Sequence, residues 1–435
     1  NMKRIICLFM ILTSLSAWAS FPEFFGSSIL NTGLGGQGSH SSKNAGNNYY
    51  APAILAWSKD VNISTAVSIV THNFNDITNV VVENPLNTFP SATTFGSVST
   101  DYESVQTASI NLALPVKTYG TFALSLFLPI GSIMETNSGD AYLPEYVLYR
   151  ARYKRISTHV NYAFTLFDDF AMSVGMHMGF EAGANIHTNA SLQGSTYGSS
   201  ANAKTQADPA IAGILSTAYR LGDHQFTATF QQELKNNLQS VATGLTANPP
   251  VAFDITIETM IYYDPHIFRL GYQSKTWFGE WALSAEYQIW DGYKTPIVRI
   301  INNSGSIIKS DDFESVSVRN ILVPKAGLKF DLTDDMNFSL GAKYKPAIFD
   351  HSFNGSGNSL DLGSMTVSGG IGYNMNLFGT PIELGGAVQH HLLLEETIVK
   401  TNLLENGAAG SKIGAPGFTA GGSITVFSLG VNVKL

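Results

Sequence analysis

Apolar and polar side chains alternate with a period of two over most of this chain. In a β-strand, successive side chains point to opposite faces, so this pattern places an apolar row on one face and a small or polar row on the other. The clearest case is the C-terminal end, where the apolar row is Phe427, Leu429, Val431, Val433 and Leu435. The same alternation begins at Val61, Ile110, Phe122, Ile156 and Met172. The sequence therefore predicts many long amphipathic strands.

Short and long connections alternate between these strands. Short turns are predicted at 117–120, 167–170, 221–224, 277–280, 332–335 and 377–380. Long polar or glycine-rich loops are predicted near residues 74–100, 132–146, 187–208, 235–250, 301–314, 348–361 and 400–417. Six turns and seven loops join about 14 strands, and an even strand number with tight turns at one end is typical of bacterial outer-membrane barrels.

The first residues have the arrangement of a secretory signal peptide. Lys3 and Arg4 precede an apolar run over residues 5–15, and Ala17-Trp18-Ala19 supplies the small side chains of a cleavage site. We therefore expect residues 1–19 to be removed.

Residues 20–56 follow, and they do not alternate. They are rich in Gly, Ser and Asn and carry Phe21, Phe24 and Phe25, which makes them too apolar for a solvated tail. We expect them to form a plug inside a barrel of residues 57–435.

Composition favours a membrane barrel over a series of soluble domains. Charged residues make up 13% of the chain, against about 25% in ordinary soluble domains. The 33 acidic residues outnumber the 25 basic ones, which disfavours nucleic-acid binding. The single cysteine, Cys7, lies in the signal peptide, so the mature chain has no disulfide, thiol nucleophile or thiolate metal site.

These features predict an all-β protein, a 14-stranded antiparallel transmembrane β-barrel with an N-terminal hatch, or plug, in the lumen. Its location would be the bacterial outer membrane. We expect a monomer in contact with outer-membrane lipid and lipopolysaccharide, without nucleic acid, metal or cofactor.

The plug region resembles a known family. Gly33-Leu34-Gly35, Asn44-Ala45-Gly46-Asn47 and Ala51-Pro52-Ala53-Ile54 resemble the hatch of the FadL/TodX family of outer-membrane transporters for long-chain fatty acids and aromatic hydrocarbons. That hatch ends in Asn-Pro-Ala, and Ala51 stands where the family has the asparagine. Three further stretches are similar in order and spacing: Leu128-Pro129-Ile130-Gly131, residues 281–290 and residues 323–346.

The resemblance implies a barrel closed by a hatch, with a hydrophobic ligand bound in an outer groove and an inner pocket. It also implies sideways exit through a gap in the wall beside the third strand, without ATP. We therefore expect passive transport of hydrophobic small molecules, such as long-chain fatty acids.

Four residues are candidates for gating or lateral opening. Pro129 cannot donate a ladder hydrogen bond, and Gly131 adds a flexible position two residues later. Pro52 and Ala53 belong to the hatch motif. The alternative for Pro129 is that its strand simply ends there.

Seven residues are candidates for ligand binding. Leu234, Leu238, Val241 and Leu245 recur at helical spacing, which predicts a short external helix that forms an outer groove with the loop at 187–208. The alternative is that this stripe packs against neighbouring loops. Phe24 and Phe25 of the plug are added on their apolar character.

Arg155 completes the set, from the crowded cations Arg150, Arg152, Lys154 and Arg155 at the outer end of a strand. We expect a solvated rim by default. Of two functional interpretations, pairing with lipopolysaccharide phosphates is favoured over attraction of a fatty-acid carboxylate.

Alternation also predicts a polar lumen lining, made of His159, His177, Glu181, Glu286, Lys325, Lys329, Lys343 and Glu383. We expect these groups to compensate one another, with one cation available for a carboxylate. No catalytic residue is assigned: His390 and His391 are adjacent in a strand and face opposite sides, and Gly369-Gly370-Ile371-Gly372 lies inside a strand, unlike a phosphate loop.

Two other functions fit the same barrel. One is a surface structural or adhesive barrel with a sealed lumen, whose long loops bind a partner. The other is a general water-filled porin, which a lumen packed by the plug would rule out.

Overall fold

The computed structural model describes residues 25–83, 94–98, 100, 102, 104–116, 119–130, 146, 155–191, 198–245, 252–294, 299–302, 317–349, 360–399 and 417–435. The expected signal peptide, Phe24, Gly131 and the cations at 150, 152 and 154 lie outside these residues.

Fourteen antiparallel strands close into one barrel, which confirms the predicted fold class. The barrel closes where the first and last strands pair, from Asn62 opposite Lys434 to Phe74 opposite Gly422. In order around the wall, the strands are β1(Asn62–Phe74), β4(Val105–Pro115), β5(Thr121–Pro129), β6(Ser157–Phe167), β7(Phe170–Ser191), β8(Gly198–Leu221), β9(His224–Gln231), β12(His266–Thr276), β13(Gly279–Ile289), β15(Ile321–Asp331), β16(Met336–Lys345), β17(Ser364–Leu377), β18(Thr380–Val399) and β19(Gly417–Lys434).

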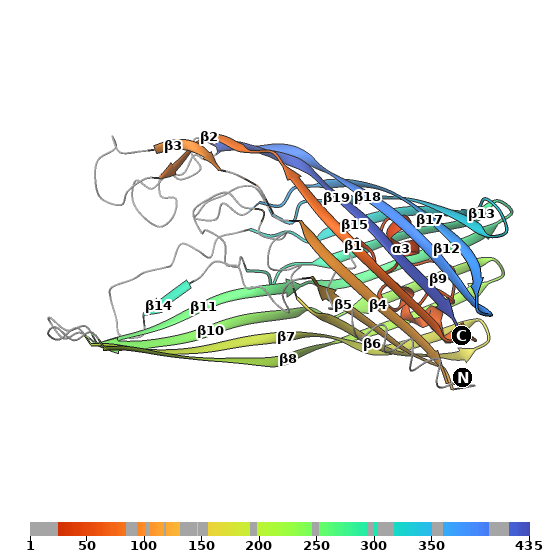
Figure 1. The fold of residues 1–435 in the computed structure, drawn as a ribbon, viewed down its shortest axis with the longest axis horizontal. Coiled ribbons are helices and arrows are strands. Elements are labelled where there is room, and N and C mark those ends of the chain that lie inside the picture. The colour runs from red at the N-terminus through yellow and green to blue at the C-terminus, as the bar shows by residue number, and fades with distance from the viewer. Residues whose placement is uncertain are drawn as a thin grey trace.

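All six predicted short turns join successive barrel strands. They lie at the end of the barrel where the C-terminus is found (Figure 1). Two of them use glycine in the left-handed region, Gly222 at φ 60° and Gly379 at φ 81°, where other residues are strained. We call this end the turn end.

Two of the predicted long loops are largely strand. β7 and β8 pair without interruption from Phe170 opposite Tyr219 to Ser191 opposite Gly198, through the expected loop at 187–208. The expected loop at 235–250 begins as β10(Leu234–Leu245), which forms a three-stranded sheet with β11(Ala252–Asp264) and β14(Arg299–Asn302). A smaller sheet, β2(Ile77–Glu83) with β3(Thr94–Val98), lies within 74–100. In Figure 1, β7, β8, β10 and β11 extend far beyond the rest of the wall, away from the turn end.

The predicted external helix is wrong. Leu234, Leu238, Val241 and Leu245 all belong to strand β10, which pairs with β11 from Leu234 opposite Asp264 to Leu245 opposite Ala252. The hydrogen bonds to β11 hold this segment in an extended conformation, and they override the local helical spacing of its leucines. Leu234 is buried beside Ala210, Ala212 and Tyr262.

The outer face of the wall is apolar, as the alternation predicts. Exposed side chains on it include Val67, Leu270, Leu283, Val388 and Leu429. Exposed aromatic residues gather at the turns, among them Tyr119, Phe167, Trp277, Phe278 and Phe378, as in the aromatic girdle at a membrane interface. Among the described residues, no helix has the length and hydropathy needed to cross a membrane.

Residues 25–57, the N-terminal segment, lie inside the barrel. They contain α3(Ile29–Gly33), α4(Asn47–Tyr50) and the 3-10 helix η1(Pro52–Trp57). Ser28 caps α3 by accepting from the Asn31 backbone N–H, and the buried Asn31 side chain in turn donates to Gln37 O at 2.7 Å. Polar contacts within the segment therefore help to hold its conformation.

Candidate functional site

The wall holds the N-terminal segment by direct hydrogen bonds from several sides. Asn111 Nδ2 of β4 donates to Ser27 O at 2.6 Å, and Gln389 Nε2 of β18 donates to Thr32 O at 2.7 Å. On the β5–β6 side, Asn48 Nδ2 donates to Ser125 Oγ at 2.9 Å. These bonds position the segment as a plug across the lumen, an arrangement that does not fit a general water-filled porin.

Glycines let α3 lie directly against the wall of β16–β19. A Cβ at Gly341 would meet the backbone of Leu34 and Gly35, and a Cβ at Gly385 would meet Ile29 Cγ2 at 3.0 Å. Close packing of two backbones needs residues without side chains.

A buried charged cluster joins the segment to β12, β13 and β15. Glu286 Oε1 accepts from Arg269 Nε at 3.1 Å and from Lys325 Nζ at 2.5 Å. Lys325 Nζ also donates to Gly36 O at 2.7 Å, and Arg269 donates to the Tyr49 hydroxyl at 2.9 Å. Glu286 and Lys325 are among the lining residues predicted from the sequence, and Arg269 is not. In the sequence, Arg269 has the same parity as Ile267 and Gln273, which places all three on one face of the strand.

The other predicted lining residues also point inward where their side chains are described. His159 and Lys343 are buried, whereas Lys329 and Glu383 are half-buried. His177 is buried and faces His159 across β6 and β7, with ring centroids 5.4 Å apart. For Glu181 only the strand position is described.

The exposed rim expected at Arg155 is wrong. Arg155 is 4% exposed, reaches both carboxylate oxygens of Asp264 at 2.5 Å and lies over the Tyr262 ring at 3.8 Å. Its partner is 109 residues away in sequence, so the pairing of strands hides the charge that the local sequence places beside other cations. A charge-assisted pair of this kind is what makes the buried position tolerable.

In several strands, the inward positions change from polar to apolar with distance from the turn end. In β1, Ser64 and Ser68 are followed by Val70 and Phe74; in β19, read in the same direction, Ser428 is followed by Val426 and Ile424. The apolar positions belong to one buried cluster, which we call the inner apolar layer. Its members are Phe25, Val70, Phe74, Ile77, Val80, Val98, Val105, Tyr146, Met260, Tyr263, Trp290, Ile321, Val323, Ile348, Phe349, Leu360, Leu362, Leu393, Ile398, Phe418, Ala420, Ile424 and Val426.

The inner apolar layer is rich in aromatic rings. Phe74 stacks on Tyr146 at 4.2 Å, and Trp290 lies 5.9 Å from Tyr263, measured between ring centroids. Phe25 of the N-terminal segment, a predicted ligand-binding residue, reaches into this layer. The rest of the layer is not predicted from the sequence. The pattern that indicates it is a run of successive apolar residues, such as Ile321-Leu322-Val323, where the alternation stops because both faces of the strand are apolar.

The predicted gating residues lie on two elements. Pro129 is the last residue of β5: the ladder with β4 reaches Pro129 opposite Thr107, whereas the ladder with β6 stops at Phe127 opposite Ser157. This fits the alternative that the strand ends at Pro129. Pro52 opens η1, and Ala53 is fully buried.

Beside the end of the β5–β6 ladder, one apolar cluster spans the wall. Tyr49, Tyr50, Phe127 and Leu128 are buried together, and partly buried Ile110, Leu126 and Ile156 pack against them. Phe127 faces the lumen, where its ring lies 6.0 Å from that of Tyr49, and Leu126 and Ile110 belong to the outward rows of their strands.

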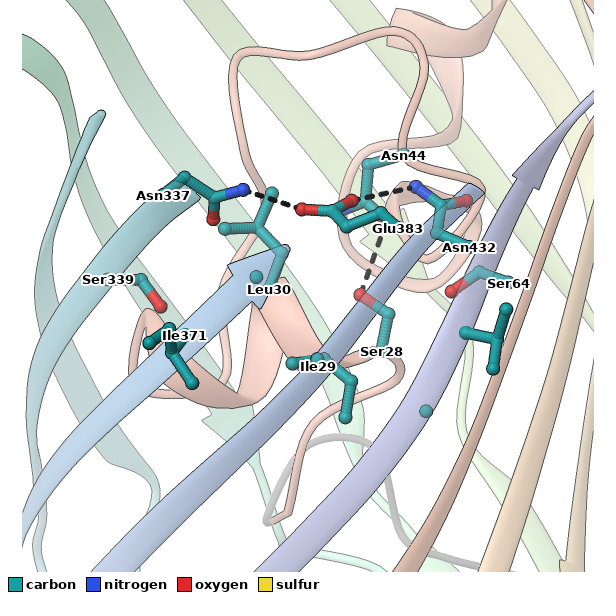
Figure 2. Close-up of a pocket in the computed structure, with 14 residues that line it drawn as sticks. Ser28, Ile29, Leu30, Asn44, Ser64, Asn337, Ser339, Ile371, Glu383 and Asn432 are labelled. Atoms are coloured by element: carbon teal, nitrogen blue, oxygen red, sulfur yellow. Dashed lines mark hydrogen bonds between the residues drawn. The ribbon is translucent and has the colours of Figure 1, made fainter. Parts of the chain in front are cut away.

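A cavity lined by both polar and apolar side chains lies between the N-terminal segment and β16–β19 (Figure 2). Glu383 Oε1 accepts from Asn337 Nδ2 at 2.7 Å, and Glu383 Oε2 accepts from Asn432 Nδ2 at 3.3 Å. Ser28 and Asn44 of the segment line the same cavity. Asn337, Glu383 and Asn432 are close to the ends of their strands, so the cavity is at the turn end.

Comparison by sequence gives no relatives: no family model matches the chain, and no curated protein is similar to it. Comparison by structure gives close likeness over nearly the whole chain. A FadL homologue from Pseudomonas aeruginosa superposes with a TM-score of 0.64 at 13% identity, over 96% of this chain and 99% of that one.

Two toluene transporters are similar as well. TodX of P. putida has a TM-score of 0.56 at 10% identity, and TbuX of Ralstonia pickettii has 0.52 at 11%; each alignment covers 95% of this chain and 99% of the other. The structure therefore bears out the resemblance in the sequence at the level of the fold: this chain has the fold of the FadL homologue and of TodX, a closed 14-stranded barrel.

Proposed function

We propose that the protein lets small hydrophobic molecules cross the outer membrane by passive diffusion through a barrel gated by its N-terminal segment. The observation that carries the proposal is the inner apolar layer, whose members in β1 and β19 belong to the inward rows of the wall. Apolar surface inside a barrel offers a hydrophobic ligand the same gain that a protein core offers, about 25 cal/mol per Å² removed from water.

Aromatic side chains in this layer support planar or long apolar ligands. The stacked rings of Phe74 and Tyr146 and the group of Tyr263, Trp290 and Tyr293 can pack against an aromatic hydrocarbon or an acyl chain. Neighbouring structures include toluene transporters, and we extend hydrophobic substrates of that kind to this chain, together with the long-chain fatty acids that the resemblance in the sequence implies.

The exit is sideways, through the wall at β5 and β6. The apolar cluster around Phe127 joins the lumen to the lipid-facing rows where the β5–β6 ladder stops. The turn end offers the opposite environment, because Glu383 and several amides line the cavity there. A hydrophobic ligand gains nothing by passing a carboxylate, so the lateral route is favoured.

Uptake into liposomes tests the transport proposal. The purified chain should accelerate entry of a fluorescent fatty acid and of toluene, and rates equal to those of empty liposomes would reject it. Ile424→Asn places an amide in the inner apolar layer and should slow entry severalfold. Its matched control is Thr425→Asn, the next residue of β19, whose side chain is on the other face.

The extended strands β7, β8, β10 and β11 (Figure 1) favour one second candidate, a surface adhesive barrel with a sealed lumen. Deleting residues 20–56 separates the two functions. A barrel that becomes leaky to small solutes supports a gated channel, and an unchanged barrier supports a sealed scaffold.

A further inference from the structure

Two glycines interrupt the apolar outer face of the wall, one on β17 and one on β18. A Cβ at Gly369 would lie nearest to Leu340, at 3.8 Å, and a Cβ at Gly386 would lie nearest to Leu429, at 3.3 Å. Both leucines are exposed on the outer face. The two glycines therefore point away from the lumen, unlike Gly385, which faces the N-terminal segment.

The backbone of these strands does not require either glycine. The β17–β18 ladder is regular from Ser364 opposite Leu393 to Leu377 opposite Thr380, so neither glycine marks a bulge. Both have φ values outside the left-handed region. Glycine weakens the interior of a strand, because it loses more conformational entropy than other residues and has no side chain to pack. Here the two glycines leave space on the outer face of the wall.

That space is a narrow apolar groove. Each glycine has a large apolar residue directly opposite it on both neighbouring strands. These residues are Leu340 and Val388 for Gly369, and Ile371 and Leu429 for Gly386. The groove is therefore about one side chain wide, between strands about 4.8 Å apart. A single hydrocarbon chain fits this width, whereas a helix of about 10 Å in diameter does not.

A polar row crosses the outer face directly beyond the groove. Thr71, Thr425 and His390 lie opposite one another on β1, β19 and β18. His390 is exposed, and its Nδ1 forms a 3.0 Å hydrogen bond with Thr425 Oγ1. The other ring nitrogen, Nε2, can bond to an oxygen atom of a bound molecule. His390 is two residues beyond Val388, so the polar row lies about 7 Å along the strand from the groove.

The height of His390 indicates which lipids meet this row. His390 is ten residues beyond Thr380, which at about 3.3 Å per residue and a tilt of about 40° places it roughly 25 Å above the turn end. The apolar band of outer-membrane barrels is about 25 Å tall, and their short turns face the periplasm. The groove is then within the outer leaflet, and the polar row is at the level of its headgroups.

We propose that the groove binds one acyl chain of lipopolysaccharide, while His390 and Thr425 bond to an ester or phosphate oxygen of the same molecule. The chain covers the bare backbone at Gly369 and Gly386, and burial of apolar surface stabilises it there. Lipopolysaccharide carries acyl chains and oxygen acceptors next to one another, as the groove and the polar row require. The site is on the lipid-facing side of the wall, so it does not depend on the proposed transport through the lumen.

Native mass spectrometry of the full chain in detergent tests the site. Delipidated protein is mixed with lipid A or with phosphatidylethanolamine, and wild type should retain one lipid A molecule under conditions that remove phosphatidylethanolamine. Gly369→Leu fills the groove and should weaken lipid A retention about tenfold, the effect of losing roughly two buried methylene groups. Ala342→Leu is the matched control, since it adds the same side chain at an exposed position of β16 outside the groove, and it should bind as wild type does.

His390→Phe tests the polar row separately from the groove. It keeps an aromatic ring on the lipid-facing surface but removes the hydrogen bonds, so lipid A retention should fall severalfold. Neither Gly369→Leu nor His390→Phe should lower Tm, measured in the same samples, because each places an apolar side chain against lipid. A loss of retention with unchanged Tm therefore reports on the site and not on folding.

Four results would overturn the proposal. They are equal retention of the two lipids by wild type, undiminished retention in Gly369→Leu or His390→Phe, an equal loss in Ala342→Leu, and a dimer of this chain in place of the lipid adduct. None of them bears on the proposed function, because no transported molecule enters the assay.

Discussion

At the scale of single residues, the lumen depends on charges that are buried and mutually paired. Arg269 and Lys325 place two cations around the one carboxylate of Glu286, and all three are nearly inaccessible to solvent. Each cation also reaches the N-terminal segment, at Tyr49 and Gly36. The cluster therefore couples the electrostatic balance of the wall to the position of the plug.

Removing the charge of Glu286 should show how strongly the stability of the barrel depends on this cluster. Glu286→Gln leaves two buried cations without their counter-charge, and we expect a loss of about 3–5 kcal/mol in the free energy of unfolding, measured by urea titration in lipid bilayers. Glu280→Gln on the same strand breaks the more exposed 3.9 Å pair with Lys275 and should cost no more than about 1 kcal/mol. Equal losses in the two variants would mean that burial of the cluster has no special weight.

Gly341 sets the distance between plug and wall. In Gly341→Val, the new side chain would overlap the backbone of Leu34 and Gly35, so the segment must move away from β16. We expect faster proteolysis of residues 25–57 and greater leakage of small solutes from liposomes. Gly369→Val is the matched control, since a Cβ there has no neighbour closer than 3.8 Å; the same leakage in both variants would contradict the role of close packing.

At the scale of elements, the sequence predicts the strands and turns that depend on neighbouring residues. It does not predict features that depend on contacts between strands far apart in the sequence. Period-two alternation and turn residues are encoded within about ten neighbours, so the strand number and all six turns were predictable. The helical spacing of Leu234 and Leu238 was misleading because β11 decides the conformation of β10. Arg155 was misplaced because Asp264 comes from a distant strand, and the inner apolar layer joins residues from Phe25 to Val426.

The N-terminal segment should loosen in acid. Burial, with the charges of Lys275 and Arg220, lowers the pKa of His40 to about 4, against the smaller raising effect of Asp223. In the released segment the value returns to about 6.5, so the free segment binds the proton more readily. Packing of the segment therefore loses stability as the pH falls from about 6.5 to about 4.

Hydrogen exchange over residues 28–57 can measure that loss. Exchange should be faster at pH 5 than at pH 7.5 after correction for the intrinsic rate, and His40→Gln should remove the His40 part of the difference. His224→Gln, at an exposed position in the neighbouring turn, should leave it in place. An identical pH effect in wild type and His40→Gln would exclude His40 as its source.

At the scale of the whole molecule, the barrel has two apolar zones at different heights along its axis. One is on the outer face of the wall, and the other is the inner apolar layer. The outer apolar rows face lipid, and the inner apolar layer begins where the segment's polar contacts with the wall give way to Val70, Val426 and their neighbours. A membrane barrel needs the first feature to exist. An apolar inner layer is not required of such a barrel, and here it lies beyond the polar contacts of the N-terminal segment.

Arginine substitutions along one strand can locate the membrane around this barrel. Val388 is exposed on the outer face of β18, eight residues beyond Thr380, which at about 3.3 Å per residue and a tilt of about 40° puts it roughly 20 Å above the turn end. Val399 is also exposed and is 11 residues further on, about 28 Å higher by the same geometry, and so beyond a hydrocarbon core of about 30 Å. We expect Val388→Arg to cost about 2–4 kcal/mol and Val399→Arg about 0–1 kcal/mol in bilayer unfolding titrations. Only a charge that lies in hydrocarbon causes the larger loss of stability. Equal losses at both positions would therefore show that Val388 and Val399 are not inside and outside the hydrocarbon core, respectively.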